Sequence, residues 1–287
     1  MSTTIEAESR SWRASSRKGR KFRGPGSVGP LGLGVAVLWL SIIVLLPLAA
    51  LLVKSFDNGL AGFWDAVTQP RAIATFKVTL EVSVATAIIN LFLGTLIAWV
   101  LVRDEFPGKR FVNAVIDLPF ALPTIVASLV LLSLYGPTSP VGLVFNATKP
   151  AVVVALLFVT LPFVVRAVQP VLIEIDKEVE EAAASLGAGN LTIFRRIVLP
   201  VLMPAVLSGA GLAFARAIGE FGSVVLIGGN IPGQTQIASQ YIRELIEYDH
   251  QVDAAAISVV LLALAFVVLF VLRIVGSRLA RREEQIR

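Results

Sequence analysis

The chain has 287 residues, and its 25 Lys and Arg against 20 Asp and Glu give a formal net charge of +5. Hydrophobic residues make up 56% of it and charged residues only 16%, whereas a soluble domain carries about 25% charged residues. This composition excludes an ordinary soluble domain, and the absence of cysteine excludes disulfides, thiol catalysis and cysteine-based metal sites. With one histidine and no carboxylates clustered inside its apolar runs, the chain also lacks the groups that a membrane-embedded enzyme would need.

Six apolar runs are long enough to cross a bilayer, which takes about 20 residues. They cover residues 30–53, 78–102, 112–135, 150–170, 200–228 and 254–275. The first run follows basic residues, as a secretory signal would, but it is too long and lacks a small-residue cleavage pattern. We therefore predict an all-α, multi-pass membrane protein with six transmembrane helices over residues 29–287.

The chain begins with a basic segment, residues 1–28, which holds seven Lys and Arg. We predict a disordered cytoplasmic tail that lies against anionic membrane lipid, so the positive charge requires no nucleic acid. If this tail is inside, nineteen of the 25 Lys and Arg fall in cytoplasmic segments and five on the opposite side. This asymmetry predicts that both termini are cytoplasmic.

A spaced motif lies between the fourth and fifth runs: Glu181-Ala182-Ala183, three residues, Gly187, nine residues, then Ile197-Val198-Leu199-Pro200. Residues 178–186 are good helix formers, and Gly187 can end that helix sharply. Asn190 can cap a second short helix, which Pro200 would stop. Its apolar residues would offer a packing face while Arg195 and Arg196 stay in water; these apolar residues are Leu191, Ile193, Phe194 and Ile197. The expected product is a rigid helical elbow.

A helix, a glycine turn and a helix with two arginines is also typical of a DNA-binding helix-turn-helix, but the membrane composition decides against it. The motif resembles the EAA loop by which membrane subunits of bacterial ABC importers grip their ATPase partners. The resemblance implies a coupling loop at about residues 174–200. Its ATPase-coupling residues would be Glu181, Ala182, Ala183, Gly187, Ile197, Leu199 and Pro200.

Ionisable groups within apolar runs are costly and point to function. Arg216 and Glu220 stand four residues apart in the fifth run, so they could pair on one helix face. The pair either lines a substrate path or braces the helices. Asp117, at the start of the third run, is a further path candidate, although it could also lie at the membrane interface.

Three segments narrow the resemblance: DLPFALPT from Asp117, PFVVRAVQPVL from Pro162 and ARAIGEFG from Ala215. They are similar to membrane subunits of the sulfate/thiosulfate permease family and of the related molybdate importers. The resemblance implies a type I ABC importer permease fold in the bacterial inner membrane. It implies four kinds of partner: a related second membrane subunit (CysW-like) in a heterodimer, two cytoplasmic ABC ATPases, an extracytoplasmic sulfate-binding protein, and sulfate or a related oxyanion.

No phosphate-binding loop of the G-x-x-x-x-G-K-[ST] type occurs in the sequence, so ATP hydrolysis is assigned to a separate subunit. We expect no catalytic residue, no metal site and no cofactor in this chain. A molybdate or tungstate importer remains an alternative, and an ion-coupled transporter or channel is a more distant one that leaves the spaced motif unexplained.

Overall fold

The computed structural model describes residues 30–284, and the predicted basic tail at residues 1–28 lies outside them. Helices and the turns between them make up the described residues, with no strand among them. The chain divides into two units, residues 1–50 and 51–287.

The first unit holds the first predicted span. Helix α1 (Pro30–Leu40), a π-helical turn η2 (Ser41–Leu45) and the start of α2 (Leu46–Lys54) follow one another without a break. No residue of η2 or α2 is buried. A helix over Gly32–Lys54 is long and apolar enough to span a membrane.

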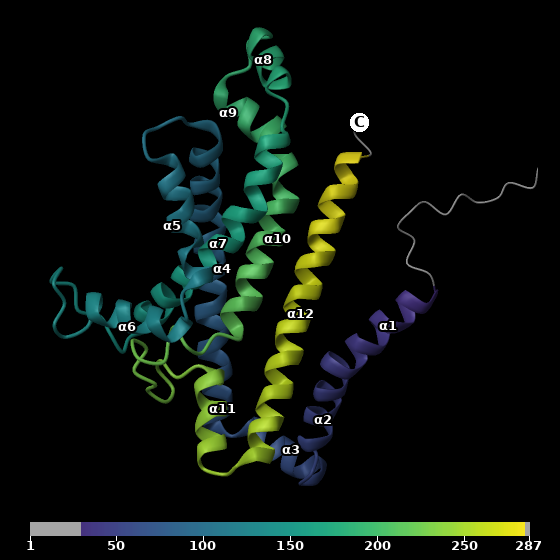
Figure 1. Cartoon of the computed structure of the whole chain (residues 1–287), viewed down its shortest axis with the longest axis vertical. Coiled ribbons are helices and arrows are strands. Elements are labelled where there is room, and N and C mark those ends of the chain that lie inside the picture. The colour runs from purple at the N-terminus through teal and green to yellow at the C-terminus, as the bar shows by residue number, and fades with distance from the viewer. Residues whose placement is uncertain (1–29, 285–287) are drawn as a thin grey trace, which may run out of the picture. The chain divides into compact units, whose positions relative to one another are not determined.

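The second unit is built around three long helices, α4 (Pro70–Arg103), α7 (Lys149–Glu174) and α10 (Leu199–Ile218), which pack on one another (Figure 1). Helix α12 (Gln251–Glu284) packs on α10, and also contacts α3 (Gly59–Thr68) and α11 (Ala238–Glu247). The remaining helices are α5 (Lys109–Ala121), α6 (Thr124–Tyr135), α8 (Lys177–Ser185) and α9 (Asn190–Ile193), the last continued by a π-helical turn η3 (Phe194–Val198). Figure 1 places α8 and α9 at one end of this unit and α11 at the other.

Small residues let the three long helices approach closely. A Cβ added at Gly94 of α4 would lie 2.7 Å from Val164 Cβ, and one added at Gly209 of α10 would lie 2.9 Å from Val164 Cα. Both glycines therefore press against the same residue of α7. Such small residues are the usual means of close helix packing in membranes, where lipid offers no hydrophobic driving force.

The third predicted span is not one helix. Between α5 and α6 the chain turns by 114°, with Leu122 and Pro123 extended. Proline has no N–H for the helical ladder and disfavours a helical residue before it, which explains the break. The span predicted over 112–135 is therefore a bent pair of helices, and six spans result if this pair counts as one.

The fifth predicted span also differs. Its helix begins at Asn190, passes through η3 into α10 and ends at Ile218, about ten residues before the predicted limit. Pro200 does not stop a helix, contrary to our expectation. Just before it, Leu199 N–H donates to Phe194 C=O, five residues back, so a widened turn accommodates the residue that has no N–H.

Candidate functional site

The predicted elbow is formed by α8, α9 and η3. Asp176 caps α8, accepting a hydrogen bond from Glu178 N–H at 2.9 Å. At the other end Gly187 adopts φ +88°, its N–H donates to Ala184 C=O, and Ala188 N–H donates to Ala183 C=O. These two bonds close a Schellman motif, which needs a left-handed residue where Gly187 stands. Gly187 thus ends the first elbow helix as expected.

The second elbow helix starts differently from the prediction. Asn190 is its first residue, Gly189 occupies the capping position, and no side chain caps it. Asn190 is therefore not the cap, and the fixed turn after Gly187 sets the start of the helix instead. Ile193 is buried while Arg195 and Arg196 are exposed, as expected, but Leu191 keeps 69% of its surface exposed and packs little.

The elbow presents an uncovered apolar surface. Leu186 is 89% exposed at the turn, and Leu191 is 69% exposed in the second elbow helix. The coupling residues Glu181 and Ala182 are also exposed, while Ala183 and Ile197 pack against the core and Leu199 and Pro200 are half-buried. Exposed leucines beside a carboxylate are typical of a protein interface.

A clamp joins the elbow to the end of α4. Arg103 forms an ion pair with Glu180 of α8, and these side chains are 13% and 20% exposed. The Arg103 guanidinium also lies 5.2 Å from the centroid of the Trp99 ring, and Trp99 meets Phe194 of η3 edge to face at 5.5 Å. The sequence did not single out Arg103 as a functional residue. Its spacing of four residues from Trp99 on one helix was the available signal.

A second candidate region is the cleft that holds Arg216 and Glu220. We predicted that Glu220 and Arg216 share one helix, but Glu220 lies just past the end of α10. The two side chains nevertheless form an ion pair. Glu220 is only 2% exposed, and its second carboxylate oxygen accepts Ser223 N–H at 2.8 Å. The Arg216 side chain is 35% exposed. A buried carboxylate thus holds a cation that reaches the surface.

The two breaks in the predicted spans meet at this cleft. Its volume is about 430 Å³. It is lined by Pro123, Thr124 and Ile125 from the α5–α6 junction, by Arg216 in the last turn of α10, and by Gly219, Glu220, Phe221 and Gly222 after that helix. A Cβ at Gly222 would lie 2.1 Å from Thr124 Oγ1, so only glycine lets the two segments approach this closely. The two breaks in the predicted spans therefore form the walls of one mostly apolar cleft, which holds the Arg216–Glu220 ion pair.

Asp117, the third path candidate, faces another arginine. Arg166 of α7 donates from Nε to Asp117 Oδ1 at 2.8 Å and pairs through Nη2 with the other oxygen. Its remaining donors reach Asn113 Oδ1 at 3.2 Å, Asn113 C=O at 3.0 Å and Gln169 Oε1 at 2.6 Å. Arg166 lies well inside α7. The proximity of Asn113, Asp117, Arg166 and Gln169 could not be foreseen because it depends on how α5 packs on α7.

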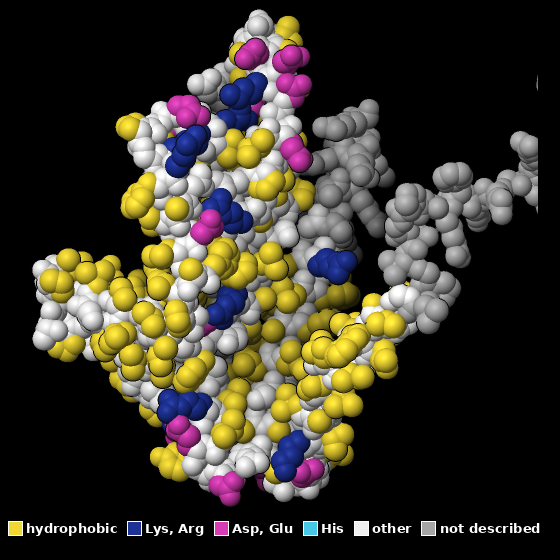
Figure 2. All heavy atoms as spheres, in the orientation of Figure 1, with side chains coloured by type: hydrophobic (Ala, Val, Ile, Leu, Met, Phe, Trp, Pro, Cys, Tyr) yellow, Lys and Arg dark blue, Asp and Glu magenta, His cyan; other side chains and the backbone are white. Residues whose placement is uncertain are grey.

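Charged residues also gather on the visible face of the second unit. Figure 2 shows dark blue groups beside magenta ones among yellow surface. Arg103, Arg166 and Arg216 each form an ion pair with a carboxylate. Within residues 30–284, no group of three or more His, Asp and Glu is arranged to hold a metal ion.

Comparison with known proteins adds three findings. Residues 90–282 match the family model described as binding-protein-dependent transport system inner membrane component. The chain is 47% identical to the sulfate transport system permease protein CysT of Synechocystis, over 84% of this chain and 86% of that one. It is 42% identical to the protein of that name from Escherichia coli, over 88% and 94%.

Among solved structures, the chain is similar to a bacterial ABC transporter that imports the acidic polysaccharide alginate. The TM-score is 0.71 at 17% identity, covering 86% of this chain and 93% of the other. The same type of transporter, in complex with an alginate pentasaccharide-bound periplasmic protein, gives a TM-score of 0.70 at 18% identity over 87% and 92%. At these identities the similarity concerns the fold alone, and it confirms the predicted ABC importer permease fold.

Proposed function

The chain belongs to the family of binding-protein-dependent transport system inner membrane components, and on this premise we propose that it is the permease subunit of an ATP-driven sulfate or thiosulfate importer. The assignment of sulfate as the substrate is supported by the 42–47% identity, over most of the chain, to proteins named sulfate transport system permeases. The chain is a transport subunit and not an enzyme.

The partners follow from the transport class. A permease of this family receives substrate from an extracytoplasmic binding protein and works with ATPase subunits. Because the sequence has no phosphate-binding loop, those ATPases are separate chains. We further propose that the second membrane subunit is a related, CysW-like chain, which gives a heterodimer around the path.

We propose that the elbow docks on an ATPase through the seven coupling residues named above. Its exposed leucines and Glu181 support this, since they form an apolar and acidic surface that nothing else in the second unit covers. The Arg103–Glu180 clamp would make the elbow move with α4, so that a push on the elbow reaches the long helices. An interface of this kind biases two conformational states of the path without covalent chemistry.

Arg216 is proposed as the cation that meets the anion in the path. A dianion in a low-dielectric region needs cationic or donor groups, but an unneutralised cation would hold it too tightly for release. Glu220 balances the charge, and its ion pair engages only one nitrogen of the Arg216 guanidinium, Nη1. The first turn of α6, at the same cleft, adds the positive end of a helix dipole. Asp117 is proposed to act by holding Arg166 instead of contacting the anion.

The proposed arrangement places both termini and the elbow in the cytoplasm, with residues 1–28 as a separate tail and 29–287 as the transmembrane domain. Because the chain has no cysteine, single cysteines can test this directly. Gln234→Cys is expected to react with an impermeant thiol reagent added outside, and Ser185→Cys is not. Outside labelling at Ser185 would overturn the orientation and the elbow assignment together.

Uptake of labelled sulfate by a strain that lacks this permease tests the function. Restoring the chain is expected to restore uptake, with thiosulfate competing and molybdate competing weakly. Restoration of molybdate uptake alone would replace sulfate by molybdate as the substrate.

A further inference from the structure

A large cleft lies away from the elbow and the Arg216 cleft, between α10 and α12. Its volume is about 550 Å³, within the range of small-molecule pockets, about 300–1,000 Å³. It is lined by Pro204, Leu207, Ser208, Gly211 and Leu212 of α10 and by Leu269, Leu272, Arg273 and Gly276 of α12. Most of this lining is apolar.

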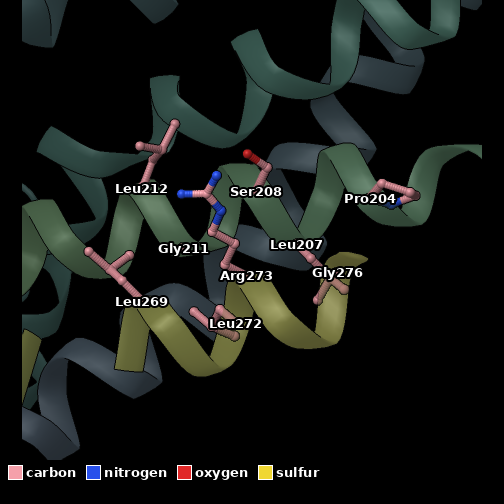
Figure 3. Close-up of a pocket in the computed structure, with 9 residues that line it drawn as sticks. All are labelled: Pro204, Leu207, Ser208, Gly211, Leu212, Leu269, Leu272, Arg273 and Gly276. Atoms are coloured by element: carbon pink, nitrogen blue, oxygen red, sulfur yellow. The ribbon is translucent and has the colours of Figure 1, made fainter. Parts of the chain in front are cut away.

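One cation stands in this apolar groove. Figure 3 shows Arg273 reaching from α12 toward α10, on the side where Ser208 carries its hydroxyl. Both residues are exposed. No acidic group of the described residues lies within ion-pair distance of Arg273, unlike Arg103, Arg166 and Arg216.

The position of Arg273 fixes the kind of ligand. It stands at the end of the span Gln251–Ile274, so its guanidinium lies where the apolar segment meets the membrane surface. An arginine at such a point extends its charge toward lipid headgroups while its stem stays on apolar surface. The leucines of the groove offer the apolar contact that an acyl chain needs.

We infer that this groove binds one anionic phospholipid, with the phosphate held by Arg273 and Ser208 and an acyl chain lying along Leu207, Leu212, Leu269 and Leu272. Charge complementarity selects an anionic lipid, because an arginine and a hydroxyl are donors without a negative partner in the groove. The bound lipid would tie α10, which continues from the elbow, to α12. This inference does not depend on the transported anion.

The test uses the full chain purified with its partner subunits, stripped of lipid and given phosphatidylglycerol or phosphatidylcholine with identical acyl chains. Native mass spectrometry counts the bound lipid. Arg273→Gln is expected to lower the affinity for phosphatidylglycerol about tenfold, the loss of one charge-assisted contact, and to leave phosphatidylcholine nearly unchanged. Arg110→Gln, which removes another exposed arginine at the start of α5, is the matched control and should change neither.

A second variant tests the apolar part of the site. Gly211 lines the groove, and a Cβ added there lies 3.5 Å from Leu272 Cδ1, an ordinary contact, so the longer side chain of Gly211→Leu should extend into the groove. Binding of both lipids should then fall. Glycerol phosphate, which has the anion without acyl chains, should not displace phosphatidylglycerol.

Four results would overturn the inference. In the first, phosphatidylglycerol binds the wild type and Arg273→Gln equally. In the second, glycerol phosphate displaces phosphatidylglycerol fully, which would indicate a phosphate site without a lipid. A complete disulfide between Leu38→Cys and Gly276→Cys would mean that the chain's own first helix fills the groove. If Gly211→Leu released the second membrane subunit from the complex, a helix of that subunit would be what fills the groove.

Discussion

Two arginines inside the long apolar helices are held in opposite ways. Arg166 donates to Asp117, Asn113 and Gln169, and all three of its guanidinium nitrogens have partners. Arg216 pairs with Glu220 through Nη1, and no other hydrogen-bond partner is found for it among residues 30–284. Both side chains are 35% exposed, so exposure does not separate them. The two arginines differ in how many of their guanidinium nitrogens have a hydrogen-bond or ion-pair partner.

The difference indicates which arginine can bind a passing anion. A guanidinium whose donors are all engaged must break existing bonds to take a new ligand, whereas one with free donors need not. Arg166 therefore fits a brace between α5 and α7, and Arg216 fits a binding group. Residue types alone would class both as intramembrane charges that are costly to insert.

The largest expected effect is on transport when Arg216 is replaced. Arg216→Met should reduce sulfate uptake to background, because it removes the cation of the cleft. Some loss of assembled complex is also expected, since Glu220 is left buried without its partner. Uptake of labelled sulfate, normalised to the amount of complex in the membrane, measures the effect.

The double variant Arg216→Met with Glu220→Gln separates binding from bracing. Removing both charges should restore assembly but not transport. Arg243→Met is the matched control, since Arg243 forms an i, i+4 pair with Glu247 in which both side chains are about half exposed, and it should transport nearly normally. Normal uptake by the double variant would refute a direct role for Arg216 and leave only the brace.

The next largest effect is expected on assembly of the complex when Arg166 is replaced. Arg166→Met leaves Asp117 and Gln169 without their main partner and should destabilise the fold by about 2–3 kcal/mol, less than for a fully buried pair because these groups are partly exposed. The yield and melting temperature of the complex should fall, while uptake per assembled complex stays near normal. Lys149→Met, which breaks the exposed Lys149–Glu81 pair, serves as the control.

If Arg166→Met assembled normally and lost transport, the contrast between the two arginines would be reversed. A partial recovery of yield in Arg166→Met with Asp117→Asn would support the brace, since it removes the unpaired carboxylate.

Sequence patterns predicted what depends on neighbouring residues in the chain. The apolar runs, the elbow turn at Gly187 and the proximity of Arg216 to Glu220 all follow from local spacing. The break at Pro123 carried a local signal, the proline, but apolar length outweighed it in the prediction. The Arg166 network and the Arg103 clamp join residues 49 and 77 positions apart, so helix packing alone creates them. The cleft at Arg216 depends on both kinds of information.

A smaller effect on transport is expected when the elbow turn at Gly187 is changed. Gly187→Val places a β-branched residue at φ +88°, which costs about 1–3 kcal/mol even though nothing lies within 4 Å of the added Cβ. The chain should insert and the Arg216 cleft should remain, but ATPase docking or coupling should weaken. The ratio of sulfate transported to ATP hydrolysed measures this.

Gly189→Val is a close control, because Gly189 has φ −73° and equally open surroundings. Gly189→Val should therefore destabilise the elbow turn much less than Gly187→Val does. Equal effects of the two variants would show that bulk at the elbow matters and that the left-handed turn does not.

The smallest expected effect concerns the clamp, whose arginine resembles Arg166 in having several partners. Arg103→Gln removes the ion pair to Glu180 and the contact with Trp99, together worth about 1–2 kcal/mol at this degree of burial. Assembly should therefore be almost unchanged, while sulfate transported per ATP hydrolysed falls about two- to threefold because the elbow moves less closely with α4. The reversed pair, Arg103→Glu with Glu180→Arg, should recover part of the coupling that either single change loses. A purely structural clamp would instead lower yield with the coupling ratio intact, and that outcome would remove Arg103 from the coupling mechanism.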